Sequence, residues 1–154
     1  MEKDLAVLLS EIDHIRTEMG QVVQKIDTSL TIYPGWTIKE MIAHITAWEI
    51  VIHKAIQTYL AGEPPYFLHE QDFDVFNQEA VDFRGDWSLE QVLQEWKDVR
   101  AKLVKTIQKI KPDDLSVVMV LPWGSERTVS ELIEIIGEHE GEHLGNSKKI
   151  AGLK

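Results

Sequence analysis

Two histidines near the end of the chain, His139 and His143, are of a type and spacing that suit metal binding. On a helix of 3.6 residues per turn they share one stripe with Leu132 and Ile136, and Ile150 continues that stripe. Their imidazoles should therefore point where the aliphatic side chains point, into the interior. Two inward imidazoles one helical turn apart are a natural pair of ligands for a divalent metal.

The same segment reads His139-Glu140-Gly141-Glu142-His143, which is a literal H-E-x-x-H. In zincin metallopeptidases this motif supplies two metal ligands and a glutamate that acts as general base. A zincin also needs a third ligand, usually downstream, and the residues after His143 include no His, Asp or Glu. The predicted elements also lack an edge strand for binding a peptide. A zincin-type metallopeptidase is therefore the minor alternative.

A third candidate ligand, His44, comes from an earlier helix. The predicted stripe of that helix includes Met41, Ile45 and Trp48, and His44 lies on its flank, about 60° from the centre. His53 falls on the opposite, polar side, so only His44 faces inward.

Three neutral imidazoles with a water molecule form a common catalytic zinc site, and imidazole also suits nickel, copper and iron. Water on such a metal has a pKa of about 7, which makes it a nucleophile at neutral pH. The structural alternative is that each histidine is a core residue satisfied by hydrogen bonds.

The elements that would position these histidines are long amphipathic helices. Apolar residues recur at steps of three and four over 2–26, from Thr37 to Gly62, over 88–110 and from Thr128 onward. Three of these segments open with a capping box, in which a Ser or Thr is followed three residues later by Glu or Gln: Thr37 with Glu40, Ser88 with Gln91, and Thr128 with Glu131. The pattern predicts an all-α protein, an antiparallel four-helix bundle.

The connection over 61–87 is long enough to cross the bundle. Phe73, Phe76, Ala80 and Phe83 have helical spacing within it, so we expect a short extra helix from about Glu70 to Phe83. The β-branched run over 117–121 predicts an extended segment or a small hairpin. No internal repeat or low-complexity tract divides the chain, so we expect one domain over 1–154.

Composition limits the function classes. The chain has 154 residues, of which 44% are hydrophobic and 27% charged, as in an ordinary soluble globular domain. Its net charge of −10 argues against nucleic acid or an anionic membrane as a partner. There is no cysteine, which excludes disulfides and thiolate ligands. The N-terminus has neither the basic start nor the apolar core of a signal peptide, so we expect a cytoplasmic protein.

Several short motifs, in order along the chain, resemble those of the DinB/YfiT-like superfamily. The segment over 35–49, Gly-Trp-Thr-Ile-Lys-Glu-Met-Ile-Ala-His-Ile-Thr-Ala-Trp-Glu, is similar to the second-helix signature of that superfamily. Pro122-Trp-Gly, the segment over 127–132 and His139-x-x-x-His143 resemble its closing segment. The segments over 61–64, 76–77 and 87–92 are similar to the ClbS/DfsB-like branch. Each motif is short, but their order and spacing make the set fairly specific.

The resemblance implies an up-down-down-up bundle, often a homodimer, with zinc or nickel held by one histidine of the second helix and two of the last. Those positions are His44, His139 and His143. Relatives include thiol-dependent transferases, isomerases and hydrolases. For the ClbS/DfsB-like branch it implies a small-molecule hydrolase, or a protective protein that sequesters or opens a reactive compound without needing the metal.

Two functions therefore compete. The first is a metal-dependent hydrolase or thiol-dependent transferase acting on a small molecule, with Glu140 as a base or as a partner to a histidine. The second is a non-catalytic or metal-independent protein that sequesters a small molecule for self-protection. Four aromatic residues could form the pocket in either case: Tyr33, Trp36, Trp48 and Trp123. Trp48 has core spacing, so Trp36 and Trp123, in loops, are the stronger pocket candidates.

Overall fold

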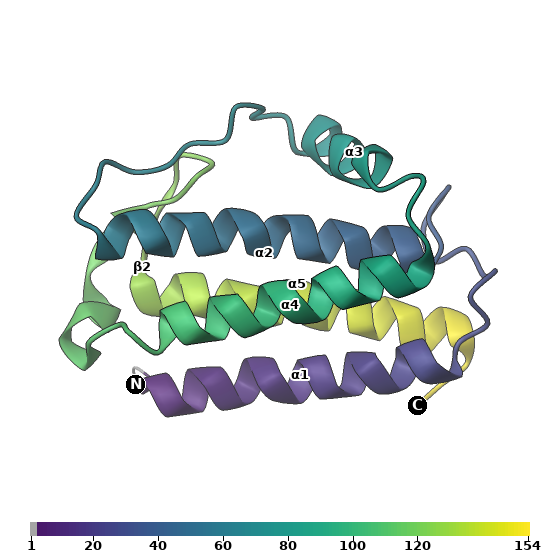
Figure 1. Ribbon diagram of the computed structural model, residues 1–154. Coiled ribbons are helices and arrows are strands. Elements are labelled where there is room, and N and C mark those ends of the chain that lie inside the picture. Colours follow the sequence, from purple (N-terminus) through teal and green to yellow (C-terminus); the bar gives the residue numbers. More distant parts are fainter. Residues whose placement is uncertain (1–2) are drawn as a thin grey trace.

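The computed structural model describes residues 3–154, and almost all of its regular structure is helical. Its elements, drawn in Figure 1, are α1 (Leu5–Lys25), α2 (Ile38–Leu60), α3 (Phe73–Phe83), α4 (Leu89–Ile107), a short 3₁₀ helix (Pro112–Ser116), β1 (Val118–Val120), β2 (Glu126–Thr128) and α5 (Val129–Ala151). The two short strands pair antiparallel as a hairpin. The expected all-α class, the short extra helix and the small hairpin are all confirmed.

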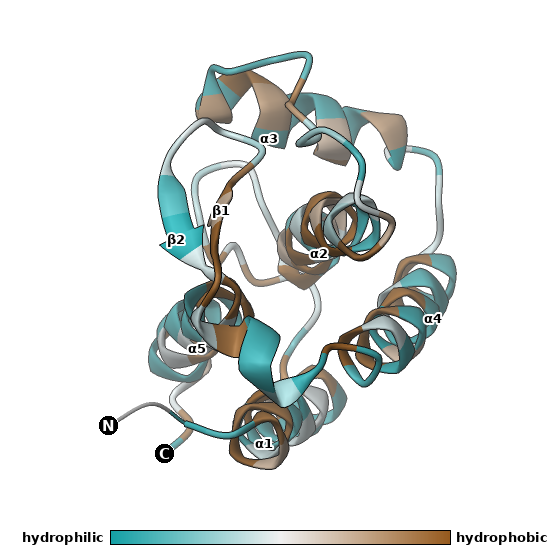
Figure 2. Cartoon of the chain, turned by 90° about the vertical axis from the view of Figure 1, so that its left-hand side faces the viewer, coloured by the Kyte–Doolittle hydropathy of each residue, from teal (hydrophilic) through white to brown (hydrophobic). Residues whose placement is uncertain are grey.

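The four long helices form an up-down-down-up bundle. In Figure 1, α1 and α5 run from left to right, whereas α2 and α4 run from right to left. Helix α1 packs along α5, and α2 packs along α4. In the end-on view of Figure 2, α3 lies outside the bundle, over α2. The connection that carries α3 crosses the molecule, which is why α2 and α4 are parallel neighbours.

The predicted capping boxes set where three of the helices begin. In α5, the backbone N–H of Glu131 donates to the Thr128 hydroxyl (3.1 Å), and the backbone N–H of Thr128 donates to the Glu131 carboxylate (3.0 Å). The boxes at Thr37 and Ser88 are also formed. Because β2 ends at Thr128, the hairpin leads directly into the helix that carries His139 and His143.

The apolar core has two clusters with a polar layer between them. One cluster, at the hairpin end, includes Ile12, Ile52, Leu103 and Ile136, and the other includes Met19, Ile45, Trp96 and Leu144. On each long helix a buried or half-buried charged residue separates the two clusters: Arg16, Glu49, Arg100 and Glu140. The histidine triad lies at the same level of the bundle.

The phase of α5 differs from the prediction by about one residue. Its most deeply buried line passes through Ile133, Ile136 and Glu140 and then through Leu144 and Ser147. His139 and His143 lie at the edge of that line and are half-buried, and Ile150 is 46% exposed instead of continuing a buried stripe. Within residues 3–154 no helix is long and apolar enough to cross a membrane.

Candidate metal centre

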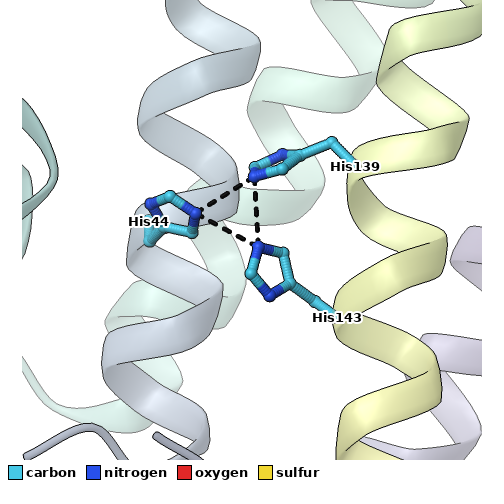
Figure 3. A group of neighbouring side chains, drawn as sticks. All are labelled: His44, His139 and His143. Atoms are coloured by element: carbon cyan, nitrogen blue, oxygen red, sulfur yellow. Dashed lines mark hydrogen bonds between the residues drawn. The ribbon is translucent and has the colours of Figure 1, made fainter. Parts of the chain in front are cut away.

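The three predicted histidines meet in space. The Nε2 atom of His44 lies 3.0 Å from Nε2 of His139 and 3.1 Å from Nε2 of His143, and the last two atoms are 3.1 Å apart. Figure 3 shows the rings converging, His44 from α2 and the other two from adjacent turns of α5. Among the described residues this is the only group of three or more His, Asp or Glu side chains close enough to hold one metal ion.

The orientation of His143 is set by Tyr33. The Tyr33 hydroxyl lies 2.7 Å from Nδ1 of His143 and accepts a hydrogen bond from Nδ2 of Asn146 at 2.9 Å. Tyr33 is held by a tight turn, in which it bridges to Trp36 and Gly35 has a φ of +78°. A proton on Nδ1 of His143 can be donated to the Tyr33 oxygen, which leaves the Nε2 lone pair facing the other two rings.

His44 is the most buried of the three histidines. It is 5% exposed, its ring packs against Trp36 with 5.2 Å between ring centroids, and its Nδ1 atom has no hydrogen-bond partner among the described residues. Asn77 of α3 lines both cavities beside His44. The carbonyl of Asn77 accepts a hydrogen bond from Nε1 of Trp48 at 2.7 Å.

Burial keeps the three rings neutral. Burial, together with positive charge on the other two histidines and against a smaller opposing interaction with Asn77, lowers the pKa of His44 to about 3. Burial, together with positive charge on His139, lowers the pKa of His143 to about 4. The pKa of His139 is also lowered, again mainly by burial. At neutral pH each ring therefore has a lone pair available, which is the form that binds a metal.

The geometry fits a divalent ion. Three nitrogens that each lie about 2.0–2.1 Å from a shared ion are about 2.8–3.0 Å apart in octahedral geometry and about 3.3–3.4 Å apart in tetrahedral geometry. The separations of 3.0–3.1 Å in the triad lie between these two values. Without a cation, three converging lone pairs would repel one another, and the available ring protons cannot bridge all three pairs of nitrogens. The triad can therefore hold a divalent metal, and an all-imidazole set suits zinc or nickel.

Two cavities meet at the triad, and His44, Asn77 and His143 line both. The first has a volume of about 340 Å³ and is mainly apolar; its other lining residues are Trp48, Ile52, Phe73, Trp123, Ile135, His139 and Glu142. The second, of about 390 Å³, is more polar and is completed by Tyr33, Pro34, Trp36, Asp74 and Gln78. The structure thus places Trp48 and Trp123 in one cavity and Tyr33 and Trp36 in the other.

Glu140 does not lie at the triad, in contrast to the expected role as base or as partner to a histidine. It is 0% exposed, and its carboxylate accepts hydrogen bonds from Nε of Arg16 (2.9 and 3.0 Å), Nε1 of Trp96 (3.1 Å) and Nη2 of Arg100 (3.2 Å). Because α5 turns Glu140 toward α1 and α4, its oxygens bond to those helices and not to the three histidines. Glu142, in contrast, is exposed and lines the first cavity.

Glu49 completes a buried ionic layer with one charged residue from each long helix. It accepts hydrogen bonds from Arg16 at 2.6 Å and from Nε and Nη2 of Arg100, both at 2.9 Å. This layer was not predicted from the sequence. A usable signal was present, because Arg100 lies between Trp96 and Leu103 on an otherwise apolar stripe.

Comparison with known proteins identifies the family. A model of the DinB superfamily matches residues 11–146, and the chain belongs to that superfamily. The uncharacterized protein YuaE of Bacillus subtilis (strain 168) is 26% identical over 124 residues, which are 75% of this chain and 76% of YuaE.

Solved structures share the fold. The colibactin self-resistance protein ClbS, in a complex with double-stranded DNA, superposes with a TM-score of 0.81 at 15% identity, covering 100% of this chain and 99% of ClbS. The mycothiol-dependent maleylpyruvate isomerase gives a TM-score of 0.78 at 15% identity, covering 94% of this chain and 60% of the isomerase chain. At these identities the likeness concerns the fold alone.

Replacing Glu140 by Gln should destabilise the protein by about 3–5 kcal/mol, because it leaves buried arginine charge uncompensated. Glu138→Gln, an exposed position on the same helix, is the matched control and should change little. Urea unfolding followed by circular dichroism measures both. If the free energy of unfolding falls no further in Glu140→Gln than in the control, the result would contradict a buried ionic layer that stabilises the bundle.

The stability of the metal-free protein should fall as the pH is lowered from about 6.5 toward 4. The folded-state pKa values of about 3 and about 4 for His44 and His143 lie below the unfolded value of 6.5. In that window the unfolded chain binds protons that the folded chain does not, which costs up to about 1.4 kcal/mol per pH unit for each group.

Urea unfolding of metal-free protein at pH 7 and pH 5 tests this dependence. His44→Gln and His143→Gln should each reduce the difference between the two pH values, whereas Ser10→Ala, at an exposed position with no titratable side chain, should leave it unchanged. If the free energy of unfolding has the same pH dependence in the wild-type protein and in all three variants, the result would contradict a neutral, buried triad.

Proposed function

We propose that this member of the DinB superfamily is a metal-dependent enzyme acting on a small molecule, either as a hydrolase or as a thiol-dependent transferase. The proposed ligands of a zinc or nickel ion are His44, His139 and His143. The observation that carries the proposal is that three neutral Nε2 atoms lie 3.0–3.1 Å apart at the wall shared by two cavities.

A divalent ion bound there supplies Lewis acidity and lowers the pKa of a coordinated water or thiol. The residues of the chain perform the other tasks. Tyr33 and Asn146 hold His143 in the ring orientation that directs its Nε2 lone pair at the site. Trp48 and Trp123 provide an apolar wall on which the substrate can displace water. The two cavities offer separate space for a substrate and for a water or thiol.

The zincin alternative lacks its base. Its general base would be Glu140, and both oxygens of that carboxylate are bonded to Arg16, Trp96 or Arg100. The H-E-x-x-H match is therefore best explained by two unrelated roles in one segment: two metal ligands and one residue of the ionic layer.

The alternative that remains is a metal-independent protein that sequesters a small molecule. It is favoured by one observation, the apolar cavity of about 340 Å³, which can hold a ligand without any metal. ClbS is described as a self-resistance protein and was solved with double-stranded DNA. For this chain, whose net charge is −10, we propose a small molecule as the partner, and neither nucleic acid nor membrane.

Localisation and assembly are part of the same proposal. We propose a cytoplasmic location, which is consistent with a chain that has no cysteine and so forms no disulfide. We also propose a homodimer, since large apolar side chains such as Phe83 (72% exposed) and Val118 (59% exposed) are available for an interface.

Metal binding tests the proposal first. Tag-free protein equilibrated with zinc or nickel and then dialysed should retain about one ion per chain. His44→Ala and His139→Ala should each abolish stoichiometric retention, whereas His14→Ala, whose side chain is 74% exposed, should retain the ion. Elemental analysis gives the ratio, and retention below about one-tenth of an ion per chain in the wild-type protein would contradict the proposal.

Turnover then separates enzyme from sequestering protein. Neutral aryl esters and reactive electrophiles, each with and without a low-molecular-weight thiol, form the substrate panel. The proposal predicts turnover by the metal-loaded protein that is lost in the metal-free protein and in His139→Ala. Tight binding without turnover, equal in the loaded and metal-free forms, would favour the sequestering alternative instead.

A further inference from the structure

The side-chain amide of Asn77 has a fixed orientation. Nε1 of Trp48 can only donate a hydrogen bond, so the Asn77 atom that lies 2.7 Å from it is the carbonyl oxygen, Oδ1. The amide nitrogen Nδ2 therefore points the other way. The N–H donor of Asn77 thus has one direction in the site.

The Nδ2 donor of Asn77 faces open space beside the triad. The carbonyl side of Asn77 contacts Trp48 and also interacts with His44, which partly offsets the lowering of the pKa of that ring by burial. The Nδ2 atom itself makes no hydrogen bond to another of the described residues and is not a buried atom that lacks a partner. Asn77 lines both cavities, and both also include His44 and His143. A free, accessible donor at the junction of two cavities is suited to hydrogen-bond a ligand.

The position of Asn77 is set by aromatic contacts that join α3 to α2. The ring of Trp48 packs against Phe76 at 4.7 Å and against Phe73 at 5.3 Å between centroids. Trp123 packs on the same group at 5.7 Å from Trp48. These contacts hold the donor in place relative to the triad.

Charge in the cavities limits what the donor can bind. Neither cavity is lined by a lysine or arginine among the described residues, and each is lined by a carboxylate, Glu142 in the first and Asp74 in the second. Apart from the proposed metal ion itself, an anionic substrate would have no cationic group to pair with there and would lie beside a carboxylate. A neutral acceptor, such as the carbonyl oxygen of an ester, amide or ketone, suits the Asn77 N–H without that cost.

We propose that the substrate is a neutral carbonyl compound with an apolar or aromatic group, and that Nδ2 of Asn77 donates a hydrogen bond to its carbonyl oxygen. The apolar group lies against Trp48, Phe73 and Trp123, which places the carbonyl beside the triad. This inference rests on the proposed function for the location of the site. Its own content is the substrate class and the role of Asn77 as a substrate-binding residue.

Binding to metal-free protein tests the inference apart from the metal chemistry. Three probes of similar shape differ only in the group to be recognised: acetophenone has a neutral carbonyl, ethylbenzene has no acceptor, and benzoate is an anion. Dissociation constants come from ligand-observed NMR, with tryptophan fluorescence as a check that the probe occupies the aromatic cavity. The wild-type protein should bind acetophenone about 2–10 times more tightly than ethylbenzene, the range of one neutral hydrogen bond, and benzoate most weakly.

Asn77→Asp is the decisive variant, because it keeps an oxygen to accept from Trp48 and removes the N–H donor. It should abolish the preference for acetophenone and leave ethylbenzene binding unchanged. Asn77→Ala should do the same, which guards against an effect of the added charge. Glu79→Gln is the matched control on the same helix, since Glu79 is exposed and lines neither cavity, and it should retain the preference.

Three results would overturn the inference: an undiminished preference in Asn77→Asp, tighter binding of benzoate than of acetophenone, or no binding of acetophenone at about 10 mM. Stoichiometric metal binding alongside any of these would leave the metal-dependent function standing and reject only the substrate class. If the wild-type protein binds no metal but still prefers acetophenone, the metal-dependent function is rejected and a carbonyl-binding cavity remains.

Discussion

The buried ionic layer is the interaction on which the rest of the structure depends. Arg16, Glu49, Arg100 and Glu140 each come from a different long helix, and the two carboxylates share both guanidinium groups. Charged groups taken out of water are stable only when each finds its partners in good geometry. The layer therefore allows one register of the four helices. Glu140 directly follows His139 on α5, so that register also brings the three histidines together.

The convergence of the three histidines depends on the same helix register. Apolar packing alone tolerates sliding of one helix along another, because methyl and methylene groups match in many positions. A site that needs three nitrogens within about 3 Å does not tolerate such sliding. The ionic layer and the apolar clusters on either side of it fix α2 against α5, and Tyr33 then sets the ring of His143 from outside the bundle.

Local patterns in the sequence predicted most of the fold and all three histidines. The helices, the capping boxes and the choice of His44 as a candidate ligand each follow from a pattern within one segment. Such local patterns can be read directly from the sequence. The position of Glu140 differs from the expected one because periodicity gives the phase of a helix only to about one residue, or 100° of rotation. That error placed the histidines at the centre of the buried face of α5 and Glu140 at its edge, the reverse of the arrangement found.

Contacts between distant segments could not be predicted in the same way. Asn77 reaches the site because α3 folds back over α2, and nothing in the sequence of α3 specifies that it meets Trp48. The ionic layer shows a related limit of prediction from sequence. Charged residues on apolar stripes were visible, but which of them pair depends on helix adjacency, and that adjacency follows from the long crossing connection.

X-ray absorption spectroscopy of zinc- or nickel-loaded, tag-free protein tests the central claim most directly, since it reports the ligands of the ion itself. The account predicts three imidazole nitrogens at about 2.0–2.1 Å together with one or more light-atom ligands from outside the chain. His44→Gln should reduce the imidazole shell. A loaded wild-type protein whose ion has no imidazole shell, or a shell that His44→Gln leaves unchanged, would contradict it.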